Sequence, residues 1–410
     1  MCKSLSEKYS DNKAINNDFT TAMNIKKLGI LPKILIAIAL GIGCSFFMPG
    51  WAVRVFLTFN SIFSNFLGMF IPLLIIGLVA PGIADLGKGA GKLLLITVVL
   101  AYSSTVLSGA FAYGSCALAY PYILGDGLTA LGSMDMSNSL APYFTIEMPA
   151  FISVTTALVL AFILGLTTAS ISGTTMKGFL VDFRDIITRV ITTVIIPCLP
   201  LYIFGIFLQM GAEGHVGAVL SAFLKIVGFI FLLHATELVF LFLVAGAVTR
   251  RDPFHALITM LPAYVTALGT ASSAATIPVT LQQAIKNGVR PETAGFTVPL
   301  CATIHMPCSI LKITAVAYAI SLSMGLPCDF GTYIGFIMML AITMVAAPGV
   351  PGGAIMAALG LLGSMLGFDA NLQGLMIAIY IAMDSFGTAG NVTGDGAIAL
   401  IVDHIRGDKA

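Results

Sequence analysis

The chain has 410 residues, of which 58% are hydrophobic and 10% are charged, and its mean hydropathy is +1.00. Soluble domains carry about 25% charged residues, so this composition excludes a soluble protein and indicates a polytopic membrane protein. The net charge of +1 says nothing of nucleic acid, but the sequence has no basic patch for phosphates, so no nucleic-acid partner is predicted. The seven cysteines are unpatterned and mostly lie in apolar runs, which predicts small buried side chains rather than disulfides.

Eight apolar segments follow a polar, lysine-rich stretch at residues 1–27. This stretch has no cleavage-like site before a short apolar region, so it is predicted to be a cytoplasmic tail rather than a signal peptide. Each of the eight segments is long enough to cross about 30 Å of hydrocarbon. The predicted spans are residues 31–48, 55–80, 93–120, 151–170, 187–210, 218–248, 294–324 and 375–402.

Two further apolar stretches, 253–284 and 332–366, are each interrupted near the middle by Ser, Gly and Pro, at 270–278 and 347–353. Each half is too short to cross alone, and irregular backbone at membrane depth needs protein or water around it. We expect two re-entrant helical hairpins. The alternative is four short helices, which would give twelve spans.

Orientation follows from the basic residues. Lys and Arg cluster at residues 26–33, 88–92, 177–189, 250–251, 286–290 and 406–409, whereas the 121–149 loop has none. The positive-inside rule then makes both termini cytoplasmic and gives the two hairpins opposite directions. Interrupted segments in corresponding places are typical of inverted-repeat secondary transporters.

The sequence DSFGTAGNVTGD at residues 384–395 places polar groups inside an apolar stretch. Asp384, Asn391 and Asp395 are seven and four residues apart, which on a helix puts them close to one face. Ionisable residues at bilayer depth mark an ion or substrate path by default. The face is therefore predicted to line a site for a cation or an amine.

The C-terminal portion, from about 250 to 404, resembles the dicarboxylate/amino acid:cation symporter family, which has the glutamate-transporter fold. The matching pieces are SSAATIPV at 272–279, PLCATIHM at 299–306, GVPGG at 349–353 and NVTGD at 391–395. The DSFGTAGN pattern resembles the serine/threonine branch. The resemblance implies an all-α membrane protein of eight spans and two hairpins, and a homotrimer in a cell inner (plasma) membrane.

The resemblance to this family also implies an elevator mechanism. Residues 28–250 would mainly form the scaffold and trimerisation domain, and 251–410 the transport domain, joined by the third span at about 91–120.

Site residues follow from the same resemblance. Asp384 would hold the substrate ammonium and Asn391 its α-carboxylate, while Asn391 and Asp395 would form a sodium site. The implied substrate-binding residues are Ser272, Ser273, Ser309, Val350, Gly353, Asp384, Gly387, Thr388 and Asn391. The implied cation-binding residues are Asn391, Asp395, Cys301, His305, Thr303, Tyr102, Thr105 and Gly349. A structural Lys312–Asp384 pair, and a helix-end role for Asp395, are the alternatives.

Two departures from the family pattern concern ions and substrate. The family's Asn-Met-Asp-Gly-Thr reads HMPCS at 305–309, so Pro307 replaces a carboxylate that helps to bind a third sodium ion. His305 could couple a proton, Lys312 could act as a tethered cation, or the site is lost and His305 is simply hydrogen-bonded, which we favour. The arginines of acidic-substrate members are replaced by Gly387 and Ala271. This predicts a substrate with a neutral side chain and room for it at Gly387.

The sequence therefore predicts a sodium-coupled symporter of a small neutral amino acid such as serine, threonine or alanine, with no organic cofactor. One alternative is an acidic amino acid or dicarboxylate symporter coupled to protons or sodium. The other is a channel-like or non-transporting binder on the same fold. No nucleophile–base set is visible, which disfavours an enzyme. His234 and Glu237 are either a buried hydrogen-bonded pair or a titrating pair.

Overall fold

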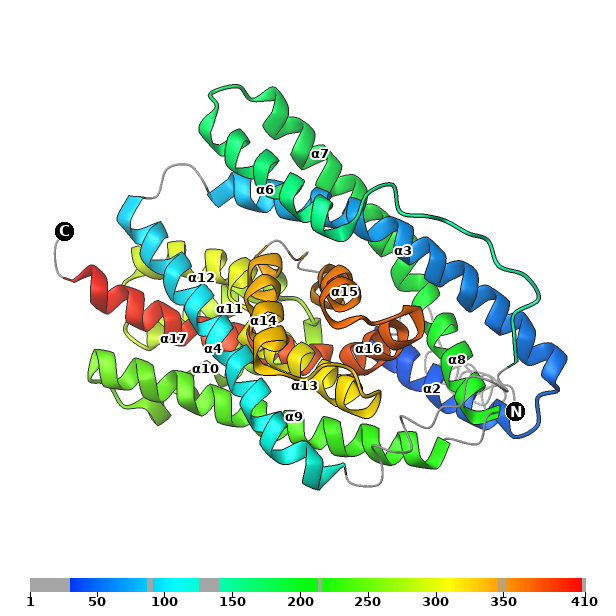
Figure 1. Ribbon diagram of the computed structural model, residues 1–410. Coiled ribbons are helices and arrows are strands. Elements are labelled where there is room, and N and C mark those ends of the chain that lie inside the picture. The colour runs from blue at the N-terminus through cyan, green and yellow to red at the C-terminus, as the bar shows by residue number, and fades with distance from the viewer. Residues whose placement is uncertain are drawn as a thin grey trace, which may run out of the picture.

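A computed structural model describes residues 30–86, 91–124, 140–212, 216–345, 347 and 352–407. Every regular element in these ranges is a helix, in agreement with the predicted all-α class. The polar tail at 1–27 and the second hairpin tip at 348–351 lie outside the described residues. The helices form two groups that lie side by side in Figure 1.

The first group, here called the first bundle, consists of helices that pack mainly on one another. Its members are α2 (Ile30–Ser45), α3 (Gly50–Leu86), α6 (Val154–Ser170), α7 (Thr175–Val190) and α8 (Ile196–Ala212). A π-helical turn, Ile191–Ile195, joins α7 to α8. Helix α3 packs along α6, and α2 packs along α8.

The second bundle contains the remaining helices and surrounds the polar C-terminal span (Figure 1). Its members are α4 (Gly91–Ile123), α9 (Val216–Thr249), α10 (Pro253–Thr270), α11 (Ser273–Lys286), α12 (Pro291–Ile304), α13 (Pro307–Ser323), α14 (Phe330–Met344), α15 (Gly353–Leu366), α16 (Ala370–Ala382) and α17 (Asp384–Arg406). Helices α4 and α9 join it because they contact α13 and α17.

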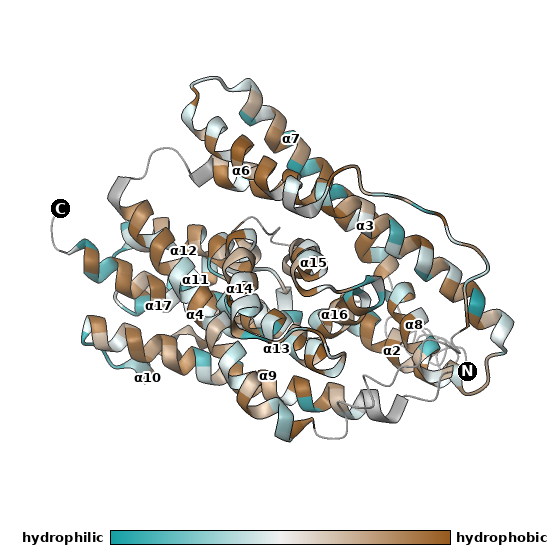
Figure 2. Cartoon of the chain, viewed as in Figure 1, coloured by the Kyte–Doolittle hydropathy of each residue, from teal (hydrophilic) through white to brown (hydrophobic). Residues whose placement is uncertain are grey.

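Every predicted span coincides with a helix or with two consecutive helices. Among the described residues, five helical segments are long and apolar enough to cross a membrane, namely 50–84, 93–123, 175–212, 221–249 and 291–323. The segment 175–212 contains α7 and α8, and 291–323 contains α12 and α13. The bent pair α16–α17 makes a sixth candidate. Helices α2 and α6, with 16 and 17 residues, are shorter than the ~20 residues that a perpendicular span needs. Most helices in Figure 2 are largely brown (hydrophobic), and teal (hydrophilic) residues occur at several helix ends, including the C-terminal end of α17.

The two interrupted stretches form helical hairpins, α10–α11 and α14–α15, whose arms pack together. In the first hairpin the chain turns at Ala271, which has a left-handed φ of 48°, and Ser272 caps α11 by accepting from the Ala275 amide. In the second hairpin α15 begins after Gly352, whose φ of 75° suits a residue without a side chain. At the start of α14, hydrogen bonds from Thr332 to the Asp329 carboxylate hold the pKa of Asp329 below its usual value.

Two other spans are interrupted where the sequence analysis expected continuous helices. The 294–324 span divides at His305 and Met306, because Pro307 starts a new helix and disfavours helical backbone before it. The 375–402 span divides at Met383, and α16 and α17 meet at 62°. Each interruption leaves backbone groups without intrahelical partners inside the second bundle.

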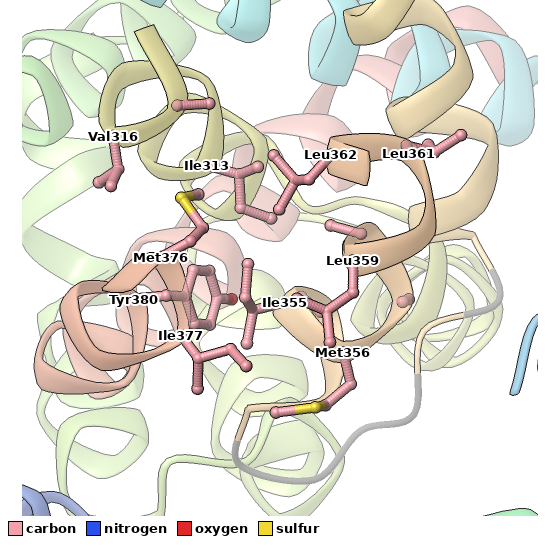
Figure 3. Packing of buried hydrophobic residues seen from close by; sticks show 14 of the residues in the cluster. Ile313, Val316, Ile355, Met356, Leu359, Leu361, Leu362, Met376, Ile377 and Tyr380 are labelled. Atoms are coloured by element: carbon pink, nitrogen blue, oxygen red, sulfur yellow. The ribbon is translucent and has the colours of Figure 1, made fainter. Parts of the chain in front are cut away.

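An apolar core holds these broken helices together. In Figure 3, Ile355, Leu359 and Leu362 of α15 face Met376 and Tyr380 of α16. Ile313 and Val316 bring α13 to the same core. Helices α15 and α16 also contact α3, α2 and α8, so they form the main link between the two bundles. The core thus fixes the Met383 break at the centre of the molecule.

Candidate functional site

The polar centre of the molecule lies where α16 ends and α17 begins. Asp384 is the first residue of α17, and its carboxylate Oδ2 accepts a 2.7 Å hydrogen bond from the Gly352 amide. This bond joins the start of α15, next to the second hairpin tip, to the eighth span. A carboxylate at a helix N-terminus is favoured by the exposed amides and by the helix dipole. The break at Met383 therefore creates a position suited to an anionic side chain inside the bundle.

Lys312 enters the same place from α13. Its side chain is completely buried, and its Nζ lies 3.6 Å from Asp384 Oδ1. Nζ also donates to the Met383 carbonyl at 3.3 Å and lies 3.5 Å from the centre of the Tyr380 ring. The alternative of a Lys312–Asp384 pair, which the sequence left open, is thus present in the structure.

Gly387 faces this lysine one turn further along α17. A β-carbon placed at Gly387 would lie 2.9 Å from Lys312 Nζ and 3.8 Å from Ser309 Oγ. The expectation that Gly387 leaves room for a larger substrate side chain is therefore wrong for this conformation, because the lysine ammonium fills that space. Lys312 of α13 thus places a positive charge beside Gly387.

Asn391 connects α17 to the beginning of α13. Its Oδ1 accepts from the amides of Cys308 and Ser309, at 2.9 and 3.3 Å, and its Nδ2 donates to Ser309 Oγ at 2.9 Å. The hydroxyl of Tyr380 donates to the same Ser309 Oγ at 3.4 Å. Ser309 and Asn391, both predicted site residues, are thus brought together, and Tyr380 was missed by the sequence analysis.

A second polar cluster lies one turn further along α17. His305 Nδ1 is 2.9 Å from Asp395 Oδ1, and His305 Nε2 is 3.0 Å from Ser104 Oγ. A neutral imidazole satisfies both contacts, since Nδ1–H can donate to the carboxylate while Nε2 accepts from the hydroxyl. Asp395 lies inside α17 and is buried, so a role for it at a helix end is excluded. The interpretation of His305 as a hydrogen-bonded histidine agrees with this geometry.

His234 and Glu237 of α9 are both buried, but they bond to different partners. His234 Nε2 is 3.0 Å from the Cys308 carbonyl, and Glu237 accepts from the Ser108 hydroxyl. The contacts match neither alternative, because His234 and Glu237 are two separately hydrogen-bonded groups rather than a pair. Glu237 also lines a mostly apolar cavity of about 510 Å³ between α4, α9 and α17. That cavity is distinct from the Asp384 centre, because neither Lys312 nor Asp384 lines it.

Several predicted cation ligands have other partners. The Tyr102 hydroxyl donates to the Met338 carbonyl at 3.3 Å, and the Thr105 hydroxyl donates to the Ala101 carbonyl of its own helix at 2.8 Å. Thr303 is exposed and donates to the Leu300 carbonyl, and Cys301 is buried against Ile398 and Val402. Ser104, which the sequence analysis did not select, is the residue of α4 that reaches His305.

The remaining predicted substrate ligands differ in their positions. Gly353 and Thr388 are buried in the second bundle, at the start of α15 and in the first turns of α17. Ser272 and Ser273 are half-buried at the tip of the first hairpin. Gly349 and Val350 lie outside the described residues. The structure therefore assembles Ser309, Asp384, Gly387 and Asn391 around Lys312, and the roles of the hairpin tips stay predictions.

The oxygen atoms near Asn391 and Asp395 decide which residues are open to a sodium ion. No group of three or more His, Cys, Asp or Glu side chains suited to a metal occurs in the described part of the chain. The Asn391 oxygen is occupied by two amides, whereas Asp395 offers a carboxylate beside the break after Ile304. The last carbonyls of α12 have no partner within that helix. Carboxylate and carbonyl oxygens are the ligands that hard cations prefer.

Buried charges inside an apolar, many-helix protein define a class of membrane protein that provides a path for ions or polar solutes. The comparisons with known proteins agree with this class. Residues 30–405 match the model of the sodium:dicarboxylate symporter family, and the chain belongs to this family. It is accordingly a multi-pass membrane symporter.

Two named relatives are similar along most of the chain. The serine/threonine transporter SstT of Acinetobacter baumannii (strain AYE) is 29% identical over 392 residues, which cover 92% of this chain and 97% of that protein. The serine/threonine transporter SstT of Streptococcus suis is 27% identical over 347 residues, covering 81% and 94%. The resemblance drawn from the four motifs is thus confirmed.

Proposed function

We propose that the chain takes up a small neutral α-amino acid, of the serine, threonine or alanine kind, together with sodium. The observation that carries this proposal is the buried carboxylate of Asp384, which accepts from the Gly352 amide and lies 3.6 Å from Lys312 Nζ. A buried carboxylate needs a cationic partner, and the substrate ammonium has three donors to give it. The names of the relatives support serine and threonine as the first candidates.

The proposed route across the membrane follows the predicted topology of eight spans with two re-entrant hairpins of opposite direction. Contacts of two arginines support the assignment of one end of the second bundle to the cytoplasmic side. Arg251 bonds the backbone at Asn287 and Gly288, and Arg290 pairs with Asp403 at 2.8 Å. The base of the first hairpin and the end of α17 therefore share one end of the bundle, which the positive-inside rule makes cytoplasmic.

Movement is proposed to follow an elevator scheme within a homotrimer, with the first bundle as scaffold and the second as transport domain. The packing of α4 on α13 and α14 supports its assignment to the transport domain. The packing of α9 on α10, α13 and α17 favours adding this helix as well. The few contacts between bundles run through α15 and α16, which would then be the sliding surface.

Sodium coupling is proposed to use fewer ions than in acidic-substrate members. Asp395 supplies one carboxylate beside the α12–α13 break, and Thr303 with the carbonyls near 346–349 would supply a second site. Pro307, the first residue of α13, has an uncharged side chain and supplies no carboxylate for a third sodium site. A sodium ion with neutral ligands alone would keep little compensation for its lost hydration.

The test is uptake of radiolabelled L-serine into proteoliposomes, driven by an imposed sodium gradient. We expect sodium-dependent uptake, and competition by threonine and alanine but not by aspartate. Serine affinity measured across a sodium series should give a log–log slope between about one and two, because coupling is reciprocal linkage. A slope near three would contradict the lost third site, and a tenfold preference for aspartate, about 1.4 kcal/mol, would contradict the substrate class.

A further inference from the structure

Lys312 is a buried cation whose contacts leave it poorly satisfied. Its side chain is fully buried in α13. Its Nζ lies 3.5 Å from the centre of the Tyr380 ring, and its contacts with oxygen atoms of the described residues are long, at 3.3 Å to the Met383 carbonyl and 3.6 Å to Asp384. A separation of 3.6 Å is beyond a hydrogen bond. Taking an ammonium out of water is expensive unless close partners replace the hydration shell. The ammonium therefore has donor capacity for another anionic group.

Asp384 is bonded more closely to the backbone than to this lysine. Its 2.7 Å bond goes from the Gly352 amide to Oδ2, while the lysine faces Oδ1 across the longer distance. Oδ1 is thus the oxygen that can exchange its cation without breaking the contact with α15. A substrate ammonium could take Oδ1 while Gly352 stays in place.

Asn391 has limited donor capacity left for a substrate carboxylate. Its amide oxygen is used by two backbone amides, and one of its two N–H groups is used by Ser309. Only one donor remains, and it is neutral. The nearest positive charge to Gly387 is Lys312 Nζ, which lies 2.9 Å from where a β-carbon would stand. A carboxylate that reached Gly387 would therefore meet the lysine.

The charges restrict the ligand further. Lys312 and Asp384 together carry no net charge, so a zwitterion can be inserted with its ammonium on Asp384 and its carboxylate on Lys312. An amine without a carboxylate would leave a buried positive charge in excess, and an acidic amino acid would leave a negative one. Uncompensated buried charges are strongly unfavourable.

We infer that Lys312 is a further receptor for the substrate carboxylate in this chain, beside the remaining N–H of Asn391, and that substrate binding replaces the internal Lys312–Asp384 pair by two pairs with the zwitterion. The inference rests on the proposed amino acid transport and assigns its specificity to a residue on α13. Lys312 is here both the resident partner of Asp384 in the empty site and the cation that selects for a free α-carboxylate.

The experiment compares L-serine with L-serinamide, which keeps the ammonium and the hydroxymethyl group but lacks the carboxylate. Binding is measured by calorimetry on the purified full chain at saturating sodium, for the unmodified protein and for Lys312→Met. The matched control is Lys225→Met, which removes an exposed lysine of α9. Lys312→Gln serves as a second variant. The glutamine amide can still donate a hydrogen bond to Asp384, whereas methionine leaves that carboxylate without a donor from α13.

The unmodified protein should prefer serine. In Lys312→Met or Lys312→Gln the serine-to-serinamide affinity ratio should fall by about thirtyfold or more, as when one partner of a buried charge pair is removed. Serinamide should bind more tightly than before, because the unpaired Asp384 then attracts a lone cation. The ratio should not change in Lys225→Met. A purely structural lysine would weaken both ligands equally.

Two results would overturn the inference. One is a ratio in the folded variants within about threefold of the unmodified ratio, a difference below 1 kcal/mol. The other, which needs no variant, is serinamide binding to the unmodified protein as tightly as serine. Failure of the proposed function would be different, since serine would then not bind the unmodified protein at all.

Discussion

Both bundles are built mainly from apolar helices, but they differ in what they bury. Within the described residues, the buried acidic and basic side chains, His234, Glu237, His305, Lys312, Asp384 and Asp395, all belong to the second bundle. The first bundle buries a neutral group instead, in which Asn60 Nδ2 donates to the Tyr202 carbonyl and Ser64 shares a 2.8 Å hydrogen bond with the Tyr202 hydroxyl. Helical packing of this kind therefore needs no buried charge, and the charges of the second bundle mark function.

The bundles also differ in continuity. Helix α3 runs unbroken for 37 residues in spite of Pro72 and Pro81, whereas the seventh and eighth spans are each interrupted at mid-depth. A proline inside a helix removes one hydrogen bond, and its neighbours can compensate in a packed bundle. The interruptions of the second bundle instead expose backbone groups beside Asp384 and His305. Irregular backbone thus occurs where polar ligands are expected.

The largest effect should come from Asp384→Asn. Removal of the carboxylate should weaken amino acid binding by about 2–5 kcal/mol, because a charge-assisted contact is lost in a desolvated site. Calorimetry with serine measures the loss, and size-exclusion chromatography checks the fold. The matched control is Asp329→Asn, since Asp329 is an exposed N-cap of α14 and asparagine caps a helix equally well. Unchanged serine affinity in Asp384→Asn would contradict the conclusion that the buried charges of the second bundle serve substrate binding.

A smaller effect should follow from Gly374→Ala, at the contact between the bundles. A β-carbon at Gly374 would lie 2.6 Å from Ile206 Cδ1 and 2.7 Å from the Tyr202 hydroxyl. The added methyl group should lower the free energy of unfolding by about 1 kcal/mol through overpacking and slow uptake more than it weakens binding. Gly228→Ala is the control, since nothing lies within 4 Å of that position. Equal uptake in the two variants would argue against a tight α8–α16 contact.

The smallest effect should be that of Tyr202→Phe in the first bundle. Loss of the hydroxyl removes its bond to Ser64 and should reduce stability by about 1 kcal/mol, with serine affinity and sodium dependence unchanged. Thermal unfolding and calorimetry on the same preparation separate the two quantities. A clear change in serine affinity would show that the first bundle contributes to the binding site.

The positions of the helices could be predicted because hydropathy and helix length report them directly. The hairpin tips were visible through their Ser, Gly and Pro residues, and the break before α13 could have been found from Pro307, which suits the first turn of a helix. The break at Met383 has no such signal. It depends on the packing of α15 and α16, which a single sequence does not reveal.

The contacts of the site were predicted less well than its members. Thr105 was selected and Ser104 was not, yet Ser104 bonds His305. Adjacent residues on a helix point about 100° apart. A motif match therefore gives the position of a residue along the helix axis more reliably than the direction of its side chain. The pairing of His305 with Asp395 joins positions 90 residues apart, and no spacing rule covers such a distance.

The lysine at the centre of the second bundle has a consequence for energetics. A sodium ion that enters with the substrate is released inside, and each charge that crosses is worth about 2.3 kcal/mol per 100 mV of membrane potential. The ammonium of Lys312 is covalently attached and returns with the protein in every cycle, so it performs no net electrical work. A carrier that neutralises its site with its own side chain therefore reaches a smaller accumulation ratio than one that recruits another ion, but it stays charge-balanced when sodium is scarce.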